Sequence, residues 1–95
     1  MELSSSANSV TINGNIKSIN DFQDIKICLD DIKAQHGDIT MNIIDSLSMT
    51  SSVIGYFNKL VLKDGINLTL KIGNAQLMDL LDDLNLSSTF NAKKA

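Results

Sequence analysis

Three segments with alternating apolar and polar residues are each followed by a segment whose apolar residues recur at helical spacing. In chain order these strand-like and helix-like segments cover residues 10–13, 22–32, 39–43, 51–62, 66–72 and 77–84. Alternation indicates a half-buried strand, whereas spacings of three and four residues indicate one face of a helix. Strands that alternate with helices need crossover connections, so the sequence predicts an α/β fold with a largely parallel sheet.

The alternation also predicts how the helices cover the sheet. A parallel strand that is buried on both faces is typically a continuous apolar run. Here the strand-like segments carry polar residues at every second position, such as Thr40, Asn42, Thr69 and Lys71. We therefore expect the helices to pack mainly on one face, leaving a half-polar second face.

The helix boundaries have local signals of their own. Ser18 and Asp21 have the spacing of a capping box, with Asp in place of the usual Glu. Asn74, after the longest alternating segment, is a plausible N-cap. A helix is expected from Ser51 to Leu62, and residues 86–90 form either a last short strand or a packed tail.

The 95 residues are enough for one domain only. Residues 1–8 are small and polar, so we expect a flexible N-terminal tail, because they offer little apolar area to offset the entropy of ordering. The domain itself is expected over residues 9–91, with a short C-terminal tail at 92–95.

Charge and composition exclude several function classes. The net charge of −3 and the lack of arginine disfavour nucleic acid as a partner. One cysteine cannot form an internal disulfide, which favours a reducing, cytoplasmic location. No apolar run approaches the roughly 20 residues of a membrane span, so no direct membrane insertion is expected. The first residues also lack the features of a signal peptide.

The sequence contains few residues that are suited to a catalytic or metal site. The single histidine, His36, is expected in a solvated loop, and Cys28 is expected to be an inert thiol beside the apolar face of a helix. One His and one Cys nearly exclude a zinc site. The paired acids at 30–31 and 82–83 diverge by about 100° on a helix, so neither pair converges on a ligand. We therefore expect no enzyme activity and no cofactor.

The segment that stands out is the start of the predicted second helix, where Thr50, Ser51 and Ser52 follow a short loop. Hydroxyls at this place have two possible roles. They can cap the helix by accepting hydrogen bonds from free N–H groups of its first turn. Alternatively, a phosphorylated hydroxyl there would meet those N–H groups and the positive end of the helix dipole. The hydroxyls alone favour capping.

Residues 43–55, with the sequence IIDSLSMTSSVIG, resemble the signature of the STAS domain, the family of bacterial anti-sigma factor antagonists. That signature is a strand ending in an aspartate, a short loop, Asp-Ser-Ser/Thr-Gly, and then Leu-Gly opening an apolar helix. Further similarity is found at Gly14, over 65–74, and in the leucines and phenylalanine of 80–90. The resemblance covers about residues 9–91.

The resemblance implies a STAS-like fold with a mixed, mostly parallel sheet of four or five strands. It also implies binding to an anti-sigma factor that is a GHKL-type serine kinase, with phosphorylation of a serine breaking the complex. A PP2C-type phosphatase that removes the phosphate is a further implied partner. Ser51 matches that serine, and Ser52 is its neighbour. The partner-binding residues implied in this way are Gly14, Asn15, Lys17, Ser48, Met49, Thr50, Ser51, Ser52, Gly55 and Tyr56.

The sequence departs from the family pattern at three positions. Thr50 and Lys17 stand where the family has acidic residues, and Val53 stands where it has a glycine. The site is therefore less negative, and Lys17 is able to pair with a phosphate. These departures keep a second hypothesis open, in which the chain is a non-phosphorylated STAS adaptor or a subunit of a larger bacterial signalling or transport complex.

Overall fold

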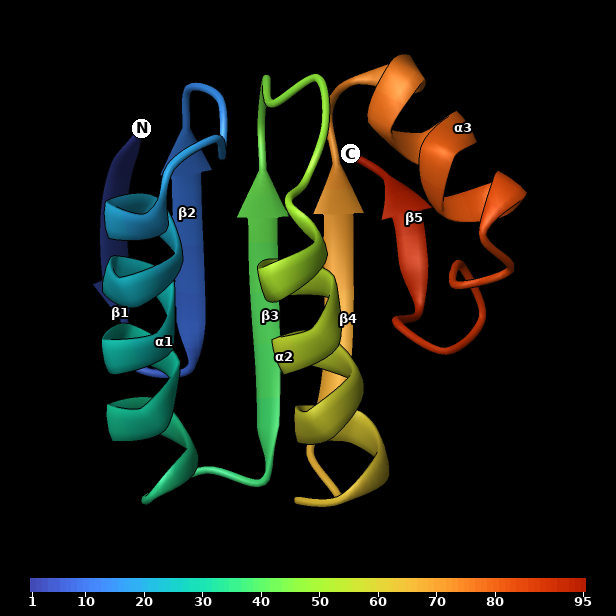
Figure 1. Ribbon diagram of the computed structural model, residues 1–95. Coiled ribbons are helices and arrows are strands. Elements are labelled where there is room, and N and C mark those ends of the chain that lie inside the picture. Colours follow the sequence, from blue (N-terminus) through green and yellow to red (C-terminus); the bar gives the residue numbers. More distant parts are fainter.

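The computed structural model describes residues 1–95, which form one five-stranded sheet and three helices (Figure 1). In chain order the elements are β1 (Glu2–Ser6), β2 (Ser9–Asn13), α1 (Ile19–Lys33), β3 (Asp38–Ile43), α2 (Ser51–Leu62), β4 (Asn67–Ile72), α3 (Ala75–Asp83) and β5 (Ala92–Lys94). The strands follow the chain order across the sheet. Strand β1 is antiparallel to β2, and all the other neighbours are parallel. The expected α/β class and mostly parallel, mixed sheet are confirmed.

One face of the sheet carries the hydrophobic core. Because the strand order never reverses, right-handed crossovers place the connecting helices on the same face. Figure 1 shows α1 and α2 in front of β1–β4, with α3 beside β4 and β5. Every second residue of β2, β3 and β4 is buried, namely Val10, Ile12, Ile39, Met41, Ile43, Leu68, Leu70 and Ile72. The residues between them are polar and half-buried or exposed, so the expected half-polar second face is confirmed.

The expected flexible tail at residues 1–8 is wrong for most of its length. Residues 2–6 form β1, which pairs along its whole length with β2 through a tight turn at Ala7 and Asn8. Ala7 has the positive φ of 53° that such hairpin turns require. Leu3 pairs with Ile12 and packs against the core. Backbone pairing therefore orders a segment with few apolar side chains.

The expected C-terminal tail is also wrong. Residues 92–94 form β5, which pairs with β4, so the ordered domain extends beyond residues 9–91 at both ends. Residues 87–91 form turns, not a strand, and bury Phe90 completely. The Phe90 ring meets that of Phe57 edge to face, with 5.7 Å between ring centroids. This packing anchors the last segment to the core.

None of the three helices has the length and apolar character that crossing a membrane requires.

Candidate functional site

Two loops at the carboxyl end of the parallel strands are joined by hydrogen bonds between residues about 30 positions apart. The loop after β2 contains Gly14, whose N–H donates to the Asp45 carboxylate at 2.6 Å. In the opposite direction, the Leu47 N–H donates to the Asn15 side-chain oxygen at 2.9 Å. Gly14 has a φ of 91°, which favours glycine. The loop after β3 is therefore held in place by the loop after β2.

Ser46 is the buried link between these loops. It is the one polar residue that is completely buried. Its hydroxyl accepts a hydrogen bond from the Ile16 N–H at 3.1 Å and donates to the Ser48 carbonyl at 2.7 Å. Ser46 was not among the predicted site residues, since a serine in a polar loop gives no sequence signal of burial.

The loop after β4 approaches the same region closely. The Gly73 N–H donates to the Ile43 carbonyl at 2.8 Å. A Cβ atom at Gly73 would lie 2.2 Å from the Ile44 carbonyl oxygen, so only glycine fits there. The loops after β2, β3 and β4 are thus packed into one rim, from which α2 starts.

Thr50 is the N-cap of α2. Its backbone is extended, and its hydroxyl accepts a hydrogen bond from the Val53 N–H at 3.3 Å. Ser51 and Ser52 follow in the first turn, and both are exposed. That turn contains no acidic residue. Two free hydroxyls therefore stand at a helix N-terminus whose positive end has no carboxylate near it in the helix sequence.

A shallow groove of about 370 Å³ separates the starts of α1 and α2. Its lining includes Lys17, Thr50 and Ser52, together with the first turn of α1 and Phe22. Ser51 lies outside this lining. The structure thus brings Lys17 and the second serine into one concave surface, although they are 35 positions apart.

Most of the predicted partner-binding residues belong to this end of the molecule, and two of them face inward. The accessible ones are Gly14, Asn15, Lys17, Ser48, Thr50, Ser51, Ser52 and Gly55. The side chains of Met49 and Tyr56 are only 6% and 5% exposed, so they are not surface contacts. They were predicted from the resemblance alone; Met49, in the loop before α2, and Tyr56, on the apolar side of α2, both belong to the hydrophobic core.

Tyr56 instead connects α2 to α1. Its hydroxyl donates to the Asp30 carboxylate, and its ring meets that of Phe22 edge to face with 6.3 Å between centroids. Lys26 and Lys33 also contact Asp30, at 3.1 and 3.3 Å. The tyrosine hydrogen bond, followed by the lysines, lowers the pKa of Asp30 to about 2. Burial, supported by the Asp30 charge, raises the pKa of Tyr56.

Lys59 of α2 has a similar structural role. Lys59 forms an ion pair of 3.3 Å with Asp64, which also binds Lys33 at 3.0 Å. These lysines lower the pKa of Asp64, while Asp64 raises that of Lys33. The contact between α1 and α2 is therefore already filled with matched charges.

The remaining chemical candidates do not converge on a site. His36 and Cys28 are half-buried, and no group of three or more His, Cys, Asp or Glu side chains is placed to hold a metal ion. Asp31 is exposed beside the engaged Asp30, so the acidic pair points in different directions as expected.

Comparison of the chain with models of protein families, with curated proteins and with solved structures finds no match.

Proposed function

We propose that this protein is a STAS-type docking module whose binding surface is the rim around the start of α2. We also propose that phosphorylation of Ser51 or Ser52 regulates this surface. The proposal rests on the resemblance of residues 43–55 to the STAS signature and on the fold class, which is compatible with it.

The observation that carries the proposal is the exposure of both serine hydroxyls in a first turn already capped by Thr50. Because Thr50 satisfies the Val53 N–H, neither serine is needed as the N-cap. A phosphoryl group there would interact favourably with the helix dipole. Residues 47–56 carry no formal charge, so it would add nearly two negative charges to an uncharged segment.

The proposed partner is an anti-sigma factor with serine kinase activity of the GHKL type, as the resemblance implies. In this scheme the unmodified rim binds the partner, and the phosphorylated rim repels it until a PP2C-type phosphatase removes the phosphate. Ser51 is the acceptor that the resemblance favours. Ser52 shares a groove with Lys17, whose ammonium group is available to pair with a phosphate.

Phosphate transfer tests this proposal. The full chain is incubated with the cognate kinase and ATP, and the modified position is located by mass spectrometry in the wild type and in Ser51→Ala and Ser52→Ala proteins. We expect one phosphate per chain, lost in only one of the two variants. Ser88→Ala, which changes an exposed serine far from the rim, is the matched control. Absence of phosphate from both positions would contradict regulation by phosphorylation.

A second candidate function is that of a constitutive adaptor in a larger bacterial signalling or transport complex. The observation in its favour is that Ile44 and Leu47 are 47% and 45% exposed on the same uncharged rim. Exposed apolar residues beside a rigid loop suit a permanent contact. In this case the contact is at Ile44 and Leu47, and Ser51→Asp should bind its partner as strongly as the wild type.

A further inference from the structure

The two edges of the sheet differ in how well they are protected from pairing with another chain. Strand β5 has three residues, two of which are lysines, and such short, charged edges resist pairing. Strand β1 has five residues, ELSSS, with a single charge at its first position. It contains neither a proline nor a lysine, so its outer edge is open to an additional strand.

The hairpin geometry identifies which backbone groups of β1 are free. The turn between β1 and β2 has two residues, so Ser6 and Ser9 on either side of it form a hydrogen-bonded pair. Because such pairs alternate along antiparallel strands, the N–H and C=O groups of Leu3 and Ser5 point away from β2. A further strand would pair with these two residues.

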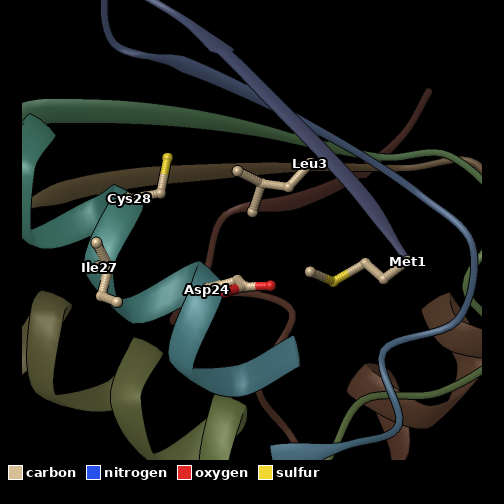
Figure 2. A pocket seen from close by; sticks show the side chains of 5 residues that line it. All are labelled: Met1, Leu3, Asp24, Ile27 and Cys28. Atoms are coloured by element: carbon tan, nitrogen blue, oxygen red, sulfur yellow. The ribbon is translucent and has the colours of Figure 1, made fainter. Parts of the chain in front are cut away.

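A side-chain hollow lies beside this free edge (Figure 2). It measures about 370 Å³ and is bounded by Met1, which precedes β1, by Leu3 on β1, and by Ile27 and Cys28 on α1. Figure 2 shows the Asp24 carboxylate on the same side of α1, toward Met1. Ile27 is 63% exposed, although it lies beside other apolar side chains. The hollow therefore offers apolar surface with one acidic group at its border.

The charges of α1 differ between its two sides. Toward α2, Asp30 is matched by Lys26 and Lys33. Toward the free edge, Asp24 and Asp31 are exposed and form no ion pair. They lie one turn before and one turn after the Ile27–Cys28 pair. This side of the helix is complementary to a basic partner. It would oppose a second copy of the chain, because a two-fold axis at Ile27 would bring acid against acid.

We propose that the β1 edge is a docking site for an extended segment of a protein partner, with an apolar side chain in the hollow and a lysine or arginine two residues away that contacts Asp24. The residue opposite Leu3 would project toward α1, because directly paired residues share a face of the sheet. Residues two positions apart also share that face, which sets the apolar-x-basic spacing. This site is separate from the rim at α2, and its existence does not depend on the function proposed there.

A selection experiment tests the proposal. Random twelve-residue peptides displayed on phage are selected against the immobilised full chain and, in parallel, against Asp24→Lys. We expect the wild type to enrich an apolar residue two positions from Lys or Arg, and Asp24→Lys to enrich Asp or Glu at that second position. Asp79→Lys, an exposed acid of α3, is the matched control and should select the same peptides as the wild type.

The enriched peptide is then synthesised, and its affinity is measured by calorimetry. We expect Asp24→Lys to weaken binding about tenfold at low salt, because one attraction is replaced by a repulsion. The exposed Ile27→Glu should abolish measurable binding without unfolding the chain, which circular dichroism checks. Slow hydrogen exchange at the amides of Leu3 and Ser5 should appear only in the complex.

Three results would overturn the proposal. Selected peptides that share no apolar-x-basic spacing would exclude the proposed docking mode. The same peptides selected by the wild type and by Asp24→Lys would also exclude it. Slow exchange at Leu3 and Ser5 without peptide, together with a dimer mass in sedimentation, would show that a second copy occupies the edge.

Discussion

The starts of α1 and α2 lie on either side of one groove, yet they are capped differently. At α1, the Ser18 hydroxyl accepts from the Asp21 N–H at 3.0 Å, and the Asp21 carboxylate accepts from the N–H groups of Lys17 and Ser18 at 3.0 and 3.2 Å. At α2, Thr50 accepts one bond of 3.3 Å, and no carboxylate follows in the first turn. One helix start contains its own anion and the other has only hydroxyls.

This difference distinguishes a helix start that already contains a carboxylate from one that lacks it. The carboxylate of α1 already interacts with the helix dipole and with free N–H groups, so a further anion gains little there. The first turn of α2 lacks such a group, and a phosphate on Ser51 or Ser52 would supply it. The comparison thus explains why the proposed modification is placed at α2 and not at α1.

The largest effect on this arrangement is expected from Ser46→Ala, because Ser46 connects the loops that lead into both helices. The substitution leaves the buried Ile16 N–H without its partner, which costs about 2 kcal/mol of unfolding free energy. Urea unfolding at pH 7 measures the loss. The exposed Ser88→Ala should change stability by less than about 0.5 kcal/mol. An equal, small effect of both substitutions would show that the loops do not depend on this link.

Removal of the N-caps should have the next largest effect and should distinguish the two helices. Ser18→Ala should cost about 1 kcal/mol, whereas Thr50→Ala should cost about 0.5 kcal/mol, since its hydrogen bond is longer and lacks a reciprocal partner. The same urea titration compares the two variants. A greater loss for Thr50→Ala would reverse the comparison between the helix starts.

The capping box also predicts a pH dependence at α1 only. Backbone hydrogen bonds from Lys17 and Ser18 lower the pKa of Asp21 below its ordinary value of 3.8, so its charged form is favoured in the folded state. The associated stability is present above pH 4 and is lost as the pH falls through the lowered pKa. Asp21→Asn should therefore flatten the decline of unfolding free energy below pH 4. The part of this decline that comes from Asp30, whose pKa is about 2, should remain.

The smallest effect is expected from an acidic residue added to each first turn. Ser51→Asp should stabilise the protein by about 0.5 kcal/mol at low salt, because it adds the missing charge near the helix dipole. Asn20→Asp should gain less, since Asp21 already supplies a carboxylate to α1. Thermal unfolding in low and in 1 M salt measures both gains, and salt should reduce them. Equal gains in the two helices would contradict the idea that the start of α2, unlike that of α1, lacks an anion.

Sequence patterns predicted the three helices and strands β2, β3 and β4 because side-chain burial dictates them. The capping box of Ser18 and the N-cap of Asn74 were also predictable, since both are local. Strands β1 and β5 were missed because backbone pairing holds them, and their side chains carry little periodicity. Within the site, the serine hydroxyls were predicted, whereas Ser46 and the burial of Tyr56 depend on contacts between distant segments.

The most direct test of the account is the dissociation constant of the proposed partner, an anti-sigma factor with kinase activity, for the wild type and for Ser51→Asp. We expect the substitution to weaken binding at least about tenfold, since it places a charge in the uncharged rim. Ser88→Asp, which adds the same charge at a distant exposed position, should bind like the wild type. Equal affinities for the wild type and for Ser51→Asp would contradict a docking surface that is controlled at the start of α2.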